Sequence, residues 1–174
     1  MNLKPLASVC AGLCLAIAAA ASAQSFGNKD DLAYAEQLWQ ALVKAGLAGK
    51  GAFQATPYPG QHPHGAVLQT LDGKVSVGGK SQVVIVKRNY GGEGVSKEAV
   101  ADNPDKFLMA VTVMVKRPGY DPANKDWFWV KYTPNGKPDK TPEGTALAGR
   151  VGMCSDCHKS APGGDQVFNH NRYK

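Results

Sequence analysis

Residues 107–116 constrain the fold of this chain more than any other segment. They run Phe-Leu-Met-Ala-Val-Thr-Val-Met-Val-Lys. Successive side chains of an extended chain point to opposite sides, and here both sides are mainly apolar. A strand with two apolar faces belongs inside a sheet that is covered on both sides. The segment therefore predicts a central strand with protein packed against each face.

Two earlier runs also have strand character. Residues 66–77 predict one long strand, or two short strands joined by a tight turn at Asp72-Gly73. Residues 82–87 form a β-branched run that ends before a predicted turn at residues 89–92. Consecutive strands with short connections favour an antiparallel arrangement.

Helical patterns lie towards the two ends of the chain. Residues 29–47 carry apolar side chains at helical spacing, and two aspartates stand near the positive N-terminal end. Residues 126–132 form the last predicted strand, and the Pro- and Gly-rich residues 133–149 predict an irregular crossing. We expect an α+β fold: a mainly antiparallel sheet, an N-terminal helix, and a short C-terminal helix that carries the cysteine motif described below.

The first 23 residues predict a cleaved export signal. Lys4 supplies the positive start, residues 9–21 are apolar, and Ala21-Ser22-Ala23 has the small-x-small pattern of a cleavage site. The alternative of a membrane anchor is disfavoured because a bilayer needs about 20 apolar residues. We therefore expect a signal peptide over residues 1–23, a single domain over residues 24–174, a periplasmic location, and no membrane insertion after cleavage.

The charge of the chain argues against a nucleic-acid partner. Its 20 basic and 14 acidic residues give a net charge of +6. The excess is dispersed, whereas nucleic-acid binders concentrate basic residues on one face or segment. No nucleic acid is expected.

The sequence Cys154-Ser155-Asp156-Cys157-His158 carries the chemistry. The chain's other two cysteines fall in the predicted signal, so the mature protein has no disulfide framework. In an exported protein, C-x-x-C-H is typical of a c-type haem, whose vinyl groups react with the thiols while the histidine binds the iron. We expect one covalently bound haem c held by Cys154, Cys157 and His158, with His158 as the axial ligand.

Two other uses of this motif are weaker. A zinc ion needs four ligands, and the adjacent Cys157 and His158 would have difficulty binding one ion together. His170 offers a third ligand, but nothing completes the set. A redox dithiol belongs at the head of a helix in a βαβ unit, and that pattern is missing from the sequence.

The face of the iron opposite His158 distinguishes classes of haem protein. Electron carriers supply a Met or His there, whereas catalytic and gas-binding haems leave the position open. We expect the methionines of residues 107–116 to fill the core and Met153 to lie on the wrong side of the haem. His62 and His64, in the Pro-rich loop predicted at residues 50–65, are expected to be solvated. An open position is therefore expected. The residues considered are Met109, Met114, Met153, His62, His64 and His170.

Lys87 shares a strand face with Val83 and Ile85. From the pattern alone it is a lysine at a strand end whose amine reaches water. The aromatic residues near the last strand predict core packing, with one or two beside the haem. These are Tyr120, Trp127, Trp129 and Tyr132.

The order of four motifs resembles the cytochrome P-460 family, which includes the cytochrome c-prime-beta proteins. They are Val-Lys-Arg-Asn-Tyr at 86–90, Met-Val-Lys-Arg-Pro-Gly-Tyr-Asp-Pro at 114–122, Asp-Trp-Phe-Trp-Val-Lys-Tyr at 126–132, and the cysteine motif followed by Asp-Gln-Val-Phe at 165–168. The resemblance spans nearly the whole predicted mature chain. Its most specific parts are the Gly-Tyr-Asp-Pro and Asp-Trp-Phe-Trp pair and the late haem motif.

The resemblance implies an exported mono-haem protein, commonly a homodimer. P-460 members oxidise hydroxylamine to nitrous oxide or nitric oxide at an open iron, with a strand lysine joined to the porphyrin. For this chain that lysine would be Lys87, and the electrons would pass to a redox protein. Two alternatives stay open: a non-enzymatic cytochrome of the c-prime-beta type, which binds gases such as nitric oxide, and a simple electron carrier.

One feature departs from the hydroxylamine-oxidising pattern. Those members tend to carry a carboxylate over the haem, on the strand before the Gly-Tyr-Asp-Pro turn. Here residues 107–115 contain no acid, and Thr112 and Met114 occupy the expected inward positions. Oxidation of hydroxylamine releases protons, so a missing base is expected to slow the reaction.

Overall fold

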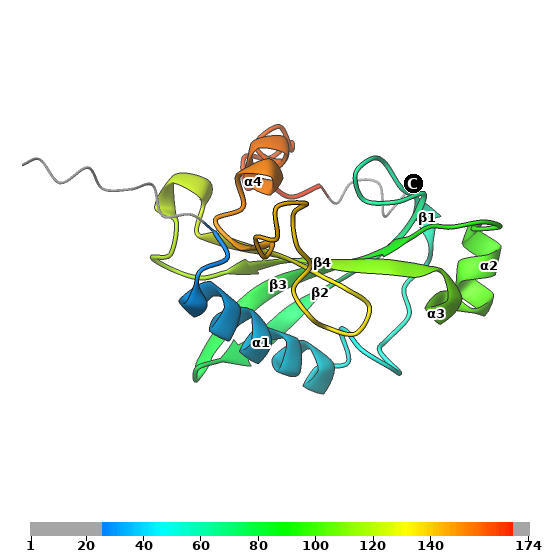
Figure 1. Ribbon diagram of the computed structural model, residues 1–174, viewed down its shortest axis with the longest axis horizontal. Helices are drawn as coiled ribbons and strands as arrows, with labels where there is room; N and C mark the ends of the chain where they lie inside the picture. Colours follow the sequence, from blue (N-terminus) through cyan, green and yellow to red (C-terminus); the bar gives the residue numbers. More distant parts are fainter. Residues whose placement is uncertain (1–25, 169–174) are drawn as a thin grey trace, which may run out of the picture.

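The computed structural model describes residues 26–168 (Figure 1). The predicted export signal and His170 lie outside the described residues. Within residues 26–168, no helix combines the length and apolar character that a membrane crossing requires. The elements are α1 (Lys29–Lys44), β1 (Tyr58–Pro59), β2 (Val67–Val77), β3 (Lys80–Tyr90), α2 (Lys97–Asp102), α3 (Pro104–Phe107), β4 (Leu108–Lys116), the 3₁₀ helix η1 (Pro122–Asn124), β5 (Trp127–Tyr132), β6 (Ala148–Gly149) and α4 (Gly152–His158).

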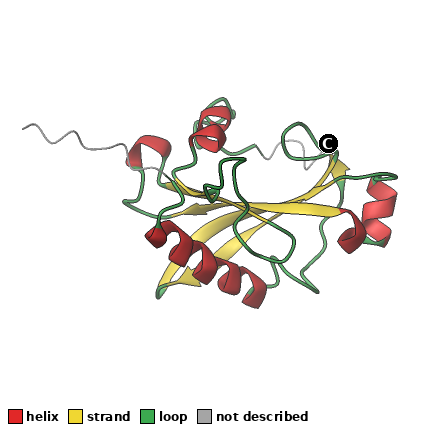
Figure 2. Ribbon diagram, viewed as in Figure 1, coloured by secondary structure: helices red, strands yellow, loops and turns green. Residues whose placement is uncertain are grey.

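The six strands form one antiparallel sheet in chain order, β1-β2-β3-β4-β5-β6 (Figure 2). The predicted α+β class is confirmed, with the helix α1 near the N-terminus and the short helix α4 carrying the cysteine motif. The strands predicted at 66–77, 107–116 and 126–132 are confirmed to within one residue at each end.

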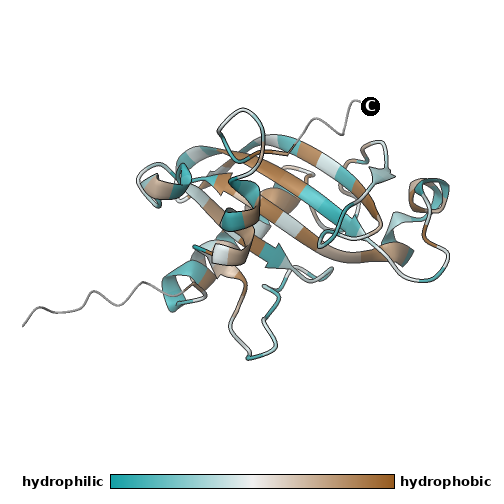
Figure 3. Cartoon of the chain, turned by 90° about the horizontal axis from the view of Figure 1, so that it is seen from above, coloured by the Kyte–Doolittle hydropathy of each residue, from teal (hydrophilic) through white to brown (hydrophobic). Residues whose placement is uncertain are grey.

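Both faces of β4 are covered, as its sequence predicts. Val111, Val113 and Val115 belong to the main core, together with Leu38 and Leu42 of α1. The alternate residues of β4 point to the opposite side of the sheet, where α4 lies (Figure 1). Figure 3 shows the resulting alternation of hydropathy along the strands. The sheet therefore has one face packed on α1, and its second face, on the side of α4, can form the wall of a site.

Of the two alternatives for residues 66–77, the single long strand is confirmed and the tight turn at Asp72-Gly73 is not formed. β2 continues through these residues, and Gly73 pairs with Val84 of β3. The chain turns instead at Gly78 and Gly79, whose φ angles are 56° and 76°. A two-residue hairpin loop of the mirror type needs positive φ at both positions, which glycine adopts without strain.

The turn predicted at residues 89–92 begins later than expected, because β3 extends to Tyr90. The Tyr90 hydroxyl is buried and donates a hydrogen bond to Gln69 Oε1 at 2.6 Å. The Asn89 side-chain amide donates to the Ala110 carbonyl oxygen of β4 at 3.1 Å. These side-chain bonds hold the strand in register beyond the β-branched run that predicts it.

Replacing Leu38 by Ala is expected to lower the free energy of unfolding by about 2–5 kcal/mol, because Leu38 is fully buried between α1 and the sheet. Leu32→Ala on the same helix is the matched control, since Leu32 is exposed. Its expected change is below about 0.5 kcal/mol. Urea denaturation followed by circular dichroism compares the two variants, and equal losses would contradict the assignment of this core.

Candidate functional site

A cavity of about 770 Å³ lies between α4 and the face of the sheet opposite α1. Pockets that hold small molecules and cofactors commonly have volumes of about 300–1,000 Å³. Its walls contain apolar side chains, the two cysteines and the histidine of the C-x-x-C-H motif, and a few other polar groups. The side chains used below are Ile85, Lys87, Asn89, Thr112, Met114, Trp129, Asp139, Cys154, Cys157, His158, Phe168 and, from the loop before β2, His64.

Helix α4 brings the motif residues to this cavity. Cys154 and His158 are four positions apart, so they lie on one face of the helix. The two cysteine thiols are free: Cys154 is half-buried and Cys157 is exposed. Burial raises the pKa of Cys154 to about 11, and the neighbouring Cys157 adds to this effect. Cys154 is therefore a protonated, unbridged thiol at neutral pH.

The His158 ring is held in one orientation. Its Nδ1 lies 2.8 Å from the Gln166 carbonyl oxygen, and its ring contacts those of Trp129 and Phe168 at centroid distances of 4.7 and 5.2 Å. A carbonyl oxygen only accepts, so Nδ1 carries the proton and Nε2 keeps its lone pair. Burial lowers the pKa of His158, with the Lys87 charge contributing in the same direction. A neutral imidazole with Nδ1–H bonded to a carbonyl is the usual arrangement of a metal-binding histidine.

Trp129 of β5, a residue of the cavity wall, carries an unpaired polar atom. Trp129 Nε1 is buried and has no hydrogen-bond partner within residues 26–168. Leaving a buried donor unsatisfied costs about 1–3 kcal/mol. A haem combines a broad apolar ring with carboxylate groups that accept hydrogen bonds. The free thiols, the His158 lone pair and the apolar walls together fit such a group.

Lys87 lies in the cavity wall, which corrects its expected place at a strand end. β3 continues past it to Tyr90, and Lys87 pairs with Thr70 of β2 and Thr112 of β4. Its side chain is half-buried on the same side of the sheet as Ile85 and Asn89. The lysine charge contributes to lowering the pKa values of His64 and His158, which line the same cavity.

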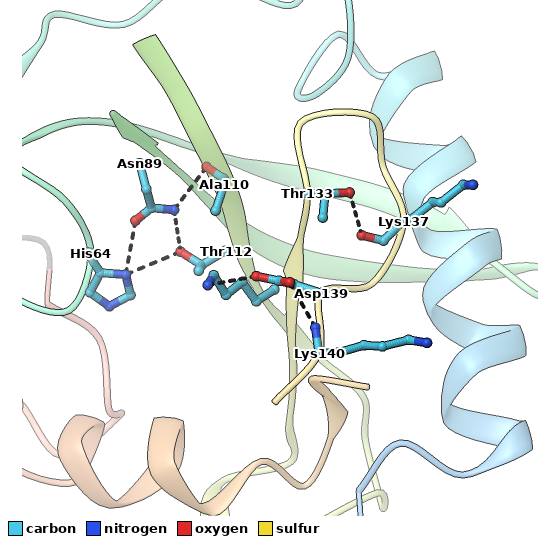
Figure 4. Close-up of polar contacts among 9 residues, drawn as sticks. His64, Asn89, Ala110, Thr112, Thr133, Lys137, Asp139 and Lys140 are labelled. Atoms are coloured by element: carbon cyan, nitrogen blue, oxygen red, sulfur yellow. Dashed lines mark hydrogen bonds and ion pairs between the residues drawn. The ribbon is translucent and has the colours of Figure 1, made fainter. Parts of the chain in front are cut away.

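His64 was expected in solvent, and the structure corrects this. His62 is exposed, but His64 is half-buried and lines the cavity. Its Nδ1 lies 3.1 Å from Asn89 Oδ1 and 3.4 Å from Thr112 Oγ1 (Figure 4). Burial lowers the pKa of His64 to about 4, and the charges of Lys87 and His158 act in the same direction. His64 is therefore neutral near pH 7.

The loop that carries His64 is tied to the sheet at its base. The Gly60 N–H donates to the Ala66 carbonyl oxygen at 2.8 Å, and the Ala66 N–H donates to the Tyr90 carbonyl oxygen at 3.0 Å. Gly60 allows this close approach, because a Cβ there would lie 2.1 Å from the Gly65 oxygen. Proline and glycine content predicts a loop here, but it carries no signal for the direction in which the loop folds.

The methionines follow the expectation only in part. Met114 is buried with Trp127 and Trp129 beside the cavity, as core filler. Met109 was also expected in the core, but 62% of it is exposed. The register between β3 and β4 shifts at Asn89/Tyr90, which leaves Met109 unpaired at a bulge. Met153 is also exposed, next to the motif.

A carboxylate reaches the cavity wall from outside β4. Asp139 (Figure 4) comes from the irregular segment after β5. Its Oδ2 lies 2.7 Å from Lys131 Nζ. The hydrogen bond from Lys131 is the main cause that lowers the pKa of Asp139. An ion-paired carboxylate of this kind accepts protons weakly at neutral pH. The inward positions of Thr112 and Met114 on β4 are as expected, since both line the cavity.

Comparison with known proteins adds one finding. A family model described as Cytochrome P460 matches residues 43–169, which include β2 to β5, the cavity and the cysteine motif. Neither the curated proteins nor the solved structures gave a match.

Replacing Cys154 and Cys157 together by Ser in a Lys87→Gln background is expected to abolish covalent retention of haem, because neither a thiol nor the Lys87 amine then remains to bond to it. Acid–acetone extraction of the purified protein measures this: pigment stays with the parent protein and is lost from the triple variant. Asp156→Asn is the matched control, because Asp156 lies between the cysteines and is exposed. Extraction of the pigment from the parent protein would contradict the assignment.

Proposed function

Because the chain belongs to the cytochrome P460 family, whose members bind haem, we propose that it is an exported mono-haem c-type cytochrome that oxidises hydroxylamine. The observation that carries the proposal is one cavity whose walls include the motif residues of α4 and Lys87 of β3. In this proposal Cys154 and Cys157 form the thioether bonds and His158 binds the iron. The protein acts in the periplasm and passes its electrons to a redox protein.

The bound haem supplies an iron that takes electrons from hydroxylamine and passes them on. The protein holds His158 between Trp129 and Phe168 and keeps its Nε2 available. Oxidation of hydroxylamine to nitric oxide or nitrous oxide releases protons and electrons in equal number. The protons need an acceptor, and the two candidates in the wall, Asp139 and His64, both have lowered pKa values. We therefore expect slow turnover.

Lys87 is the residue that we propose bonds to the haem. Its side chain lies in the wall of the cavity and is half-buried. Formation of the N–C bond removes one hydrogen from the amine and one from a ring carbon, so a two-electron oxidant such as peroxide is required. The bond would fix the orientation of the ring and shift its ferrous absorption to longer wavelength.

A second candidate function is non-enzymatic binding of nitric oxide, as in the c-prime-beta branch. It is supported by the apolar part of the wall, to which Ile85, Met114 and Trp129 contribute. The lack of an acid on β4 and the ion pair of Asp139 also favour binding over turnover. The two functions share the haem and differ in whether hydroxylamine is consumed.

Purified protein is expected to reduce an artificial electron acceptor over many turnovers when hydroxylamine is added. The measurement is acceptor reduction per haem with product analysis for nitric oxide and nitrous oxide. The Cys154→Ser/Cys157→Ser variant controls for reaction without thioether attachment of the haem. Binding of nitric oxide without any acceptor reduction by hydroxylamine would favour the second candidate.

Lys87→Gln is expected to remove the long-wavelength shift of the ferrous spectrum, because no amine then remains to bond to the ring. Tryptic mapping of the parent protein should yield a haem peptide that joins residues 154–158 to the segment containing Lys87. Lys80→Gln on the exposed start of the same strand is the control and should keep that joined peptide. An unmodified peptide containing Lys87, recovered from protein matured with oxidant, would contradict the cross-link.

A further inference from the structure

We propose that His64 is the second axial ligand of the haem iron in the resting protein, on the face opposite His158. This inference rests on the haem attachment proposed above and deepens it by naming the group at the sixth position. It replaces the open position expected from the sequence: hydroxylamine or nitric oxide would have to displace His64 before binding.

The distance between the two imidazole rings is the first observation that supports this inference. The centroids of His64 and His158 are 6.0 Å apart, and their planes are inclined by 85°. Two imidazoles that bind one metal ion from opposite sides, each through a bond of about 2 Å, have centroids about 6 Å apart. A histidine that only contacts a small ligand on the iron would have to stand farther away. The observed separation therefore suits direct binding by both rings.

The two histidines reach the same cavity from different elements. His158 belongs to α4, whereas His64 belongs to the loop that returns to the sheet before β2. In Figure 4 the second ring nitrogen of His64 lies on the side of the ring that faces α4. A metal ion between the rings would thus join two segments that are far apart in the sequence.

The hydrogen-bond network of Asn89 determines which nitrogen of His64 is available. The Asn89 amide nitrogen donates to the carbonyl oxygens of Lys87 and Ala110 at 3.0 and 3.1 Å, and to Thr112 Oγ1 at 3.2 Å. This fixes the orientation of the amide, so Oδ1 is the atom 3.1 Å from His64 Nδ1. Oδ1 only accepts, so Nδ1 donates and Nε2 keeps its lone pair.

Both rings are therefore prepared in the same way. At His158 the Nδ1 proton goes to the Gln166 carbonyl oxygen, and at His64 it goes to Asn89 Oδ1. In each case an outer hydrogen bond holds the ring and leaves Nε2 for a metal. Asn89 acts through His64 and is a positioning residue, which makes it a second place to test the inference.

The spin state of the purified holoprotein tests the inference directly. Ferric parent protein is expected to be low-spin and six-coordinate by absorption and electron paramagnetic resonance. His64→Ala is expected to be high-spin, and added imidazole should restore the low-spin spectrum. His62→Ala, on the exposed part of the same loop, is the control and should remain low-spin. A high-spin parent protein, or a His64→Ala variant that stays low-spin, would overturn the inference.

Ligand binding and the positioning residue provide further readouts. Ferrous His64→Ala is expected to bind carbon monoxide at least tenfold faster than the parent, because no side chain has to leave first. Asn89→Leu removes the acceptor for Nδ1 and should gain a high-spin fraction. Equal carbon monoxide rates in the parent and His64→Ala would also overturn the inference.

Acid–acetone extraction of the same samples separates the two proposals. Pigment that stays on a high-spin parent protein would leave the proposed function intact while overturning the role of His64. Pigment lost from the parent protein would overturn the attachment and this inference together.

Discussion

The alternation of side chains across β3, β4 and β5 is the constraint on which the rest of the structure depends. One set of alternate residues, including Val86, Val113 and Phe128, packs in the core under α1. The other set faces α4 and builds the cavity wall. A shift of one residue in any of these strands would exchange the two sets and destroy core and site together. The stability of the fold and the shape of the site therefore share one cause.

Polar groups within this second face form a connected cluster. Asn89, Thr112 and His64 bond to one another and to backbone carbonyls of β3 and β4. Burying such groups singly would be costly, whereas a connected network orders each member. The result is a wall in which one histidine has a fixed tautomer. Asp139 belongs to the same wall but is committed to Lys131.

Strand alternation and the cysteine motif are patterns within a few neighbouring residues, so the features that depend on them can be predicted from the sequence. The central strands, α1 and the position of the motif on a C-terminal helix follow from spacing of a few residues. His64 could not be placed in this way, because its position depends on bonds between its loop and Tyr90 of β3. Met109 was missed because a bulge depends on the register of two strands. Asn89 and Thr112 are polar residues at inward positions of apolar strands. They were the one sequence signal that a polar side chain, here His64, packs against them.

The tied base of the His64 loop has a kinetic consequence. The bonds between Gly60 and Ala66 and between Ala66 and Tyr90 close the loop as a small unit, and His64 lies inside that unit. Such a unit can open by local fluctuation while the sheet stays folded, at a free-energy cost far below that of global unfolding. Entry and release of small ligands at this side of the cavity would then occur on the timescale of the loop motion. They would not depend on fluctuations of the core.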